Sequence, residues 1–326
     1  MYAAVINEFG QVPEYRQVPE PEVPDGQVLA QVRAAAIKNI ERMLVDGTHY
    51  ASAQMSLPAQ VGLDAVAVLP DGRRVYTGSA PPAGTMAEFI AVEPHNVIEL
   101  PDDVDDAQAA AMPNAALSAW FALEFAGQMQ ADQTVLVLGA TGVTGGLAVQ
   151  LAKHQFGAGR VVAVGRNPNR LGTLADLGAD VTVRIDEDFD RLGQTLRGVH
   201  EQQPFDLVID YLWGQPAQAA LGALANDDLT AEYHRTRYVQ VGETAGGTIE
   251  LRASVLRSAG VELIGQGAGS VPREAFARVE TEILPALFTA LSSGTISIPT
   301  HVRPLSEVAA AWDEPTDSGV RTVLVP

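Results

Sequence analysis

The sequence predicts an α/β protein with two domains, one rich in β-strands and one built on a doubly wound parallel sheet. A length of 326 residues is ordinary for two domains. Residues 1–113 have the pattern of short strands divided by turns, and residues 114–268 alternate apolar strands with helical stretches. Residues 269–326 are too few to fold alone, so we expect them to pack against the first segment.

The first segment has the composition of strands and tight turns. Clusters of Pro, Gly and Asp at 23–26 and 70–72 divide its apolar runs, and such clusters break regular structure. The expected strands are Tyr2–Ile6, Val28–Ala35, Ala65–Leu69 and Ala87–Val92.

In the second segment, the strand–helix alternation predicts βαβ units, which form a parallel sheet with helices on both faces. The expected strands are Thr134–Leu138, Arg160–Val164, Val181–Arg184, Leu207–Asp210, Tyr238–Val241 and Val261–Ile264. The clearest helices are Gly146–His154 and Arg170–Leu177. In the third segment we expect a helix over Arg273–Ser292, a strand at His301–Arg303, a helix over Glu307–Trp312 and a strand at Arg321–Val325.

Composition excludes several classes of function. A formal net charge of −19 disfavours binding to nucleic acid, because the phosphate backbone would be repelled. The absence of cysteine rules out disulfides and thiolate metal sites, and it fits a reducing cytoplasm. No apolar run reaches the roughly 18 residues of a membrane span, and the N-terminus has no signal-peptide pattern. The aspartate runs at 102–106 and 186–188 are interpreted as solvated faces or helix starts.

A Gly-rich turn lies between an apolar strand and an amphipathic helix. The turn is Gly139-Ala140-Thr141-Gly142-Val143-Thr144-Gly145. Small residues let a backbone approach a pyrophosphate, and the helix N-terminus offers N–H groups and a positive dipole end to it. The spacing is GxxGxxG rather than GxGxxG, so the strand–turn–helix context carries the inference. We therefore expect Gly139, Thr141, Gly142, Val143, Thr144 and Gly145 to bind a dinucleotide.

The residues after the next strand indicate which dinucleotide. An NAD site usually has an acid at this point for the ribose hydroxyls, and none follows Val164. Instead, Arg166, Asn167 and Arg170 lie where a 2′-phosphate would bind, and guanidinium groups suit phosphate geometry. The sequence favours NADP(H) over NAD(H), although both arginines could simply be solvated loop residues.

Several segments, in order along the chain, resemble the zinc-independent quinone oxidoreductase branch of the medium-chain dehydrogenase/reductase superfamily. The segments are Gly84–Phe89, Ala109–Pro113, Leu117–Trp120, Gly139–Lys153, Leu177–Asp180 and Phe205–Asp210. The resemblance implies a GroES-like catalytic domain over 1–113 and 269–326. It also implies a Rossmann cofactor domain over 114–268, with hydride transfer in the cleft between the two. Relatives are often dimeric, so a homodimer is expected.

The same resemblance also indicates which residues occupy the zinc-ligand positions of the superfamily. Zinc members of the superfamily hold the metal with two cysteines and a histidine, and here those positions carry Lys38, Leu63 and Asn114. In zinc members an acidic residue follows the histidine. Here Asp64 follows Leu63, which occupies the histidine position. These three side chains are not a zinc ligand set, so we expect no metal site.

Without a metal, the substrate carbonyl must be polarised by hydrogen bonds or by a cation. Lys38 could supply the charge, or it could point to solvent or pair with Glu41. Tyr50 falls where the family often places a pocket tyrosine, and it could equally be a half-buried loop residue. Asn114 could donate an amide hydrogen bond, or it could only turn the chain at the domain boundary.

The resemblance also implies that the nicotinamide is bound by backbone groups after the fifth and sixth strands, at Val241, Gly242 and Gly267. Glycine permits the close approach that backbone contacts need. Tyr211, after the fourth strand, could touch the ribose or the adenine, or could belong to the core.

The leading hypothesis is NADPH-dependent reduction of quinones or α,β-unsaturated carbonyls. The alternatives are an alcohol or ketone reductase and a non-catalytic NADPH-binding redox sensor. A hydrolase is disfavoured because no G-x-S-x-G motif is present, and a short-chain dehydrogenase because no Tyr-x-x-x-Lys pair is present.

Overall fold

The computed structural model describes residues 1–78, 84–226 and 232–326, and they form two compact units. The first unit is Met1–Asn114 together with Val279–Pro326, and the second is Ala115–Arg278. The sequence-based boundaries are 113 and 268.

The first unit carries most of the short strands of the chain. Its strands are β1 (Tyr2–Ile6), β2 (Glu14–Gln17), β3 (Val28–Ala36), β4 (Ala59–Gln60), β5 (Val66–Val68), β6 (Arg74–Tyr76), β7 (Phe89–Val92), β8 (Ile98–Glu99), β15 (Thr300–Pro304) and β16 (Arg321–Val325). Its helices are α1 (Asn39–Val45), α2 (Asp106–Ala111), α10 (Leu284–Ser292) and α11 (Val308–Asp313), with 3-10 turns at Tyr50–Gln54 and Leu305–Glu307 and a π turn at Val279–Ile283.

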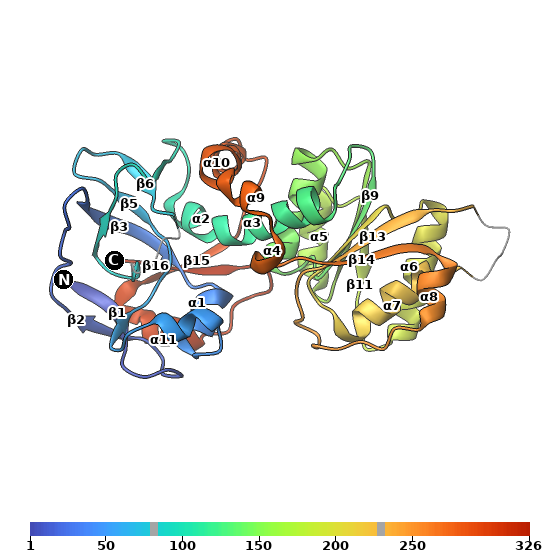
Figure 1. The fold of residues 1–326 in the computed structure, drawn as a ribbon, viewed down its shortest axis with the longest axis horizontal. Coiled ribbons are helices and arrows are strands. Elements are labelled where there is room, and N and C mark those ends of the chain that lie inside the picture. Colours follow the sequence, from blue (N-terminus) through green and yellow to red (C-terminus); the bar gives the residue numbers. More distant parts are fainter. Residues whose placement is uncertain (79–83, 227–231) are drawn as a thin grey trace. The chain divides into compact units, whose positions relative to one another are not determined.

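The tail completes the main sheet of this unit, as expected. In that sheet the order is β15-β16-β3-β5-β6-β8, and β7 also pairs with β3 (Figure 1). Strand β16 runs antiparallel to β3, with Val323 opposite Ala36. A smaller sheet has the order β2-β1-β4. The core joins both ends of the sequence, because Trp312 and Leu324 pack with Val5 and Ile90.

The second unit alternates strands and helices. Its strands are β9 (Thr134–Leu138), β10 (Arg160–Gly165), β11 (Val181–Arg184), β12 (Leu207–Asp210), β13 (Arg235–Gln240) and β14 (Gly260–Gly265). Its helices are α4 (Val143–Gln150), α5 (Pro168–Asp176), α6 (Phe189–Gln202), α7 (Gly214–Leu224), α8 (Ala253–Ser258) and α9 (Arg273–Ala277), with π turns at Ala122–Ala126 and Leu151–Gln155 and a 3-10 turn at Ala268–Ser270. Helix α3 (Pro113–Phe121) spans the boundary between the units.

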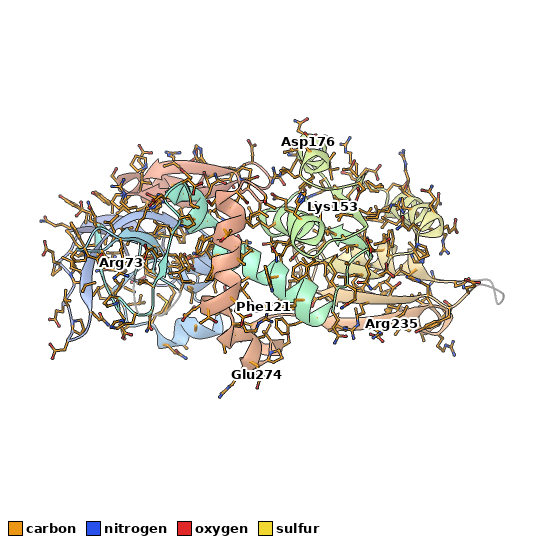
Figure 2. The ribbon with its side chains drawn as sticks, turned by 90° about the horizontal axis from the view of Figure 1, so that it is seen from above. Arg73, Phe121, Lys153, Asp176, Arg235 and Glu274 are labelled. Carbon is orange, nitrogen blue, oxygen red and sulfur yellow. The ribbon has the colours of Figure 1, made fainter. Side chains whose placement is uncertain are left out.

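The sheet of this unit is parallel, with the order β11-β10-β9-β12-β13-β14 (Figure 1). The central strands β9 and β12 are buried throughout, because helices cover both faces of a parallel sheet of this kind. The order reverses between β9 and β12, so ligands are expected at their carboxyl ends. At the sheet edge, Arg235 of β13 (labelled in Figure 2) donates two hydrogen bonds to Glu262 of β14.

Two local features differ from the sequence-based expectation. The helix expected over Arg273–Ser292 is divided into α9, a π turn and α10, and Pro285 lies in the first turn of α10, where its missing N–H costs nothing. Helix α1 was not expected in the β-rich segment. Its start is stabilised by Glu41, whose Oε2 accepts from the backbone N–H of Lys38 at 3.2 Å.

The aspartate runs do start helices, as interpreted from the sequence. Asp105 Oδ1 accepts from the N–H of Gln108 at 2.9 Å at the start of α2. Asp188 Oδ1 accepts from the N–H of Arg191 at 2.9 Å at the start of α6. A side-chain acceptor at this position satisfies an N–H group that the helix leaves unpaired. Among the described residues, no helix is long and apolar enough to cross a bilayer.

Candidate cofactor and active site

The Gly-rich turn packs so tightly that it admits no side chain at two positions. Gly139 has a φ of +84°, which favours glycine. A Cβ on Gly145 would lie 2.3 Å from the carbonyl oxygen of Gly139. Helix α4 begins directly after Gly142, and Val143 and Thr144 in its first turn are only half-buried. The backbone at the start of α4 is therefore close to a strand end and partly accessible, as binding of a pyrophosphate needs.

A third glycine joins this turn to the next strand. Thr141 is buried, and a Cβ on Gly165, at the end of β10, would lie 2.4 Å from the Cγ2 of Thr141. Thr141 thus packs into the space that glycine leaves, and the turn is held against β10. The end of β10 is the point at which the sequence places Arg166, Asn167 and Arg170.

Arg170 is a half-buried cation beside the Gly-rich turn. A Cβ on Gly146, in the first turn of α4, would lie 3.3 Å from an Nη of Arg170. The Nε of Arg170 is buried and has no hydrogen-bond partner among the described residues. Burial lowers the pKa of Arg170. Asn167 accepts from the N–H of Arg170 at 3.1 Å and so caps α5, while Arg166 is exposed. The fold therefore brings one predicted arginine to the turn and leaves the other on the surface nearby.

The ends of β12 and β13 meet at the predicted nicotinamide-binding backbone. Val241 and Gly242 donate their N–H groups to the carbonyl of Asp210 at 2.8 and 3.1 Å. A Cβ on Gly242 would lie 2.7 Å from the carbonyl oxygen of Tyr211, so the approach requires glycine. Gly267 is exposed, and its N–H donates to Ser270 Oγ at 2.8 Å.

Tyr211 is a core-like residue with an unsatisfied polar end. Its side chain is nearly buried, and burial raises its pKa. Its hydroxyl has no hydrogen-bond partner among the described residues. Its backbone N–H donates to Leu138 at 3.1 Å, which places Tyr211 beside the Gly-rich turn. Unsatisfied buried groups are uncommon in folded proteins, so the hydroxyl of Tyr211 is a candidate ligand contact.

A cavity of about 310 Å³ adjoins this region, within the volume range of small-molecule sites. It is lined by Trp213, Gln240, Glu243, Gly247, Leu263 and Gly265. Sequence reasoning did not single out Trp213. No sequence signal could have done so, because its role depends on an unusual backbone conformation and on a neighbouring loop.

In the first unit, Lys38 is buried, so the idea that it points to solvent is wrong. Its side chain is 1% exposed, and Nζ lies 2.6 Å from Asp64 Oδ1 and 2.8 Å from Glu41 Oε1. The pairing with Glu41 that the sequence suggested is confirmed. Tyr76 donates its hydroxyl to Asp64 Oδ2 at 3.0 Å. Arg321, also largely buried, adds a second cation that interacts with both carboxylates.

The charge state of this cluster follows from its composition. Burial alone would lower the pKa of Lys38, but the carboxylates of Asp64 and Glu41 outweigh it, and the pKa lies above its ordinary value. Burial raises the pKa of Glu41 against the opposing effect of Lys38. Lys38 is therefore a protonated ammonium, which has no lone pair to offer a metal.

The other two positions do not supply zinc ligands either. Leu63 has no donor atom. Asn114 is exposed in the first turn of α3, so it begins a helix rather than a turn. No group of three His, Cys, Asp or Glu side chains suited to a metal occurs among residues 1–78, 84–226 and 232–326. Tyr50 begins a 3-10 turn, and its side chain lies outside the described part of the structure.

Comparison with known proteins agrees with this architecture. A family described as zinc-binding dehydrogenase matches residues 143–276, a range that contains none of Lys38, Leu63 and Asn114. A probable NADPH-dependent quinone reductase of Emericella nidulans is 27% identical over the full length of both chains. A chloroplastic NADPH-dependent alkenal/one oxidoreductase of Arabidopsis thaliana is 31% identical, over 56% of this chain and 52% of its own.

Among solved structures, the quinone oxidoreductase from Thermus thermophilus, also known in complex with NADPH, has a TM-score of 0.79. It is 26% identical and covers 100% of both chains. The predicted fold class, a β-rich GroES-like domain plus a Rossmann domain, is confirmed. These matches support the medium-chain dehydrogenase/reductase superfamily. Within that superfamily, the full-length matches to quinone reductases support the zinc-independent quinone oxidoreductase-like branch.

Proposed function

We propose that the protein is a zinc-independent, NADPH-dependent oxidoreductase that reduces quinones or α,β-unsaturated carbonyls. The observation that carries the proposal is the half-buried guanidinium of Arg170 beside the Gly-rich turn, whose Nε has no partner in the described part of the chain. A desolvated cation is stabilised by an anion, and a 2′-phosphate is the anion that distinguishes NADPH from NADH. The names of the relatives in Emericella nidulans and Arabidopsis thaliana support the same cofactor and the same two substrate classes.

The residues of the second unit would hold the cofactor in three parts. The turn Gly139–Gly145 and the start of α4 bind the pyrophosphate through backbone N–H groups. Arg166, Asn167 and Arg170 bind the 2′-phosphate. Val241, Gly242, Gly267 and Tyr211 orient the nicotinamide and its ribose. When bound, NADPH supplies the hydride.

The first unit would then provide donors to the substrate oxygen. In an enone the oxygen becomes more negative as the β-carbon is reduced, and in a quinone the reduced carbonyl oxygen does so. Hydrogen-bond donors aimed at that oxygen lower the barrier. We propose Tyr50 and Asn114 as these donors. Because the ammonium of Lys38 is engaged by two carboxylates, a direct part for Lys38 stays a prediction, as does the interdomain cleft.

A substrate panel run with both NADPH and NADH tests the function. We expect oxidation of NADPH with 1,4-naphthoquinone and with a 2-alkenal, slower turnover with NADH, and little with simple ketones. Turnover of ketones alone would instead identify an alcohol or ketone reductase. NADPH binding without turnover of any of these substrates would identify a redox sensor.

We further propose that the protein works in the cytoplasm, because it has no cysteine that an oxidising compartment could use. We also propose a homodimer. Strand β14 is at the edge of its sheet, and an unpaired strand edge can pair with a second copy. Sedimentation equilibrium of the purified protein tests the second point.

A further inference from the structure

Trp213 has a backbone conformation that its residue type disfavours. Its φ is +56° and its ψ is −156°, a combination that a residue with a Cβ rarely adopts. Such conformations persist only where surrounding interactions impose them, and they gather at functional sites. Trp213 also lines the cavity of about 310 Å³. The residue with the strained backbone therefore lies at the cavity.

Buried hydrogen bonds impose this conformation. Asp210 Oδ1 accepts from the N–H groups of Leu212 and Trp213 at 2.8 and 3.0 Å. Asp210 Oδ2 accepts from the hydroxyl of Tyr238 at 2.8 Å. Asp210 and Tyr238 are both fully buried. One carboxylate therefore satisfies three donors and sets the path of the chain from β12 into α7.

The turn is also attached to a second segment that lines the cavity. Thr244 Oγ1 donates to the carbonyl of Tyr211 at 3.0 Å, and Ala245 N–H donates to the carbonyl of Leu212 at 2.8 Å. A Cβ on Gly214 would lie 2.5 Å from the carbonyl oxygen of Ala245, so the two segments are in close contact. The segment that carries Glu243 and Gly247 is thus held together with the turn that carries Trp213.

The Trp213 side chain is fixed on its other side by the core. It is half-buried and packs against the apolar cluster that includes Leu221 and Tyr238. An indole that packs on the core, in a residue that lines a cavity, can offer that cavity a rigid, flat, apolar surface. Such a surface binds flat rings well, because offset stacking adds to the burial of apolar surface.

We propose that Trp213 is a specificity-determining residue that stacks on a planar conjugated ring in this cavity, and that Asp210 and Tyr238 are positioning residues for it. This inference rests on the proposed function, because the ring would be either the nicotinamide of the cofactor or the quinone substrate. The shared chemistry is a flat, electron-poor ring, which the nicotinamide has in NADP⁺ and a quinone has before it is reduced. An electron-rich indole attracts such a ring, whereas a ligand without the ring gains nothing from Trp213.

Tryptophan fluorescence of the full-length protein tests the stacking. The probes are NADP⁺, which does not absorb tryptophan emission, 1,4-naphthoquinone, and 2′,5′-ADP, which has no nicotinamide. The variants are Trp213→Phe and, as a matched control in the same unit, Trp120→Phe. We expect NADP⁺ or the quinone to quench wild type and Trp120→Phe, and quenching to be largely lost in Trp213→Phe. The ligand that quenches identifies the ring. Equal quenching in both variants would overturn the proposal.

Calorimetry measures how much Trp213 contributes to the affinity for the quenching ligand. In Trp213→Gly, glycine adopts the positive φ readily and the ring is removed. The affinity of this variant for the quenching ligand should fall roughly three- to tenfold, while its affinity for 2′,5′-ADP stays unchanged. Unchanged affinity for every probe would overturn the proposal. Failure of wild type to bind NADP⁺ or 2′,5′-ADP at all would instead contradict the proposed function.

The positioning role has its own readout. Tyr238→Phe removes one donor to Asp210 and keeps the ring in the core. In a Trp120→Phe, Trp312→Phe background, in which Trp213 is the remaining tryptophan, we expect Tyr238→Phe to shift the emission maximum of Trp213. Affinity for the quenching ligand should fall, while 2′,5′-ADP binds as before. Asp210→Asn, which keeps the shape but weakens the acceptor, should do the same. An unaltered spectrum and unaltered affinity in both variants would show that the pair has no positioning role.

Discussion

At the scale of single residues, charge placement decides what the candidate cations do. Arg166 is exposed, and Arg170 is half-buried beside the Gly-rich turn. Lys38 is buried between two carboxylates. The proposed cofactor site uses the arginines, while the ammonium of Lys38 is engaged by carboxylates inside the fold.

For the arginines, we predict that Arg166→Glu raises the KM for NADPH roughly tenfold or more and leaves the KM for NADH nearly unchanged. A charge-assisted hydrogen bond contributes about 1.5–3 kcal/mol, and the new carboxylate would also repel the 2′-phosphate. Steady-state kinetics with both cofactors measure this. Arg191→Glu, an exposed substitution elsewhere in the same unit, is the control. Equal effects on the two cofactors would remove the argument for a 2′-phosphate site.

For Lys38, we predict that Lys38→Met lowers the free energy of unfolding by about 3 kcal/mol or more. The substitution leaves Glu41 and Asp64 buried without their main cation, and removing one partner of a buried pair is costly. The chain offers a matched control in Lys153, whose ion pair with Asp180 is partly exposed. Lys153→Met should cost no more than about 1 kcal/mol. Urea unfolding compares the two, and similar losses would contradict the structural role of Lys38.

At the scale of elements, the packing of α4 against β9 depends on glycine. Gly145→Ala places a Cβ 2.3 Å from the carbonyl oxygen of Gly139, so we predict a loss of about 1–3 kcal/mol of stability and weaker NADPH binding. Gly172→Ala, in α5, meets nothing within 4 Å and should instead stabilise by about 0.5–1 kcal/mol. Thermal unfolding and calorimetry measure both. If Gly145→Ala leaves stability and NADPH binding unchanged, the turn has room for a Cβ at this position.

The connection between α6 and β12 makes stability depend on pH. Burial, followed by the charges of His234 and Arg197 and opposed by Asp206, lowers the pKa of His200 to about 4. The unfolded chain has an ordinary histidine pKa of about 6.5 and takes up the proton first. The stabilisation is therefore full above about pH 6.5 and is lost as the pH falls towards about 4.

We predict that wild type loses more stability than His200→Gln between pH 7.5 and pH 5. His200 Nδ1 accepts from the N–H of Phe205 at 3.0 Å, and the substituted glutamine could still accept from this group although it does not titrate. Urea unfolding of both proteins at the two pH values measures the difference. Parallel losses in the two proteins would show that His200 does not cause the pH dependence.

At the scale of the whole molecule, the proposed reaction works without zinc. Cysteine is absent from the entire sequence, and the family resemblance places Lys38, Leu63 and Asn114 at the zinc-ligand positions. We predict that incubation with EDTA or 1,10-phenanthroline, followed by desalting, leaves NADPH oxidation by the proposed substrates within about twofold of the untreated rate. Metal analysis of the desalted protein accompanies the assay. Loss of activity that zinc restores would contradict the metal-free mechanism.

Much of the fold could be predicted from the sequence because its signals are local. Apolar runs such as Thr134–Leu138 and Leu207–Asp210 have the same bounds in the structure as in the prediction. The Gly-rich turn was recognisable because strand, turn and helix are adjacent in sequence. The break at Val279–Ile283 was not predicted, because a π turn leaves the helical periodicity of apolar residues almost intact.

The sequence by itself thus determined the two-part α/β architecture and the Gly-rich turn between β9 and α4. Only the tertiary structure decided that Lys38 is buried between Glu41 and Asp64, and that Trp213 is strained beside a cavity. The reason is physical. Secondary structure follows from periodicity within a few residues, whereas burial, pKa and backbone strain depend on groups that folding brings together from distant parts of the chain.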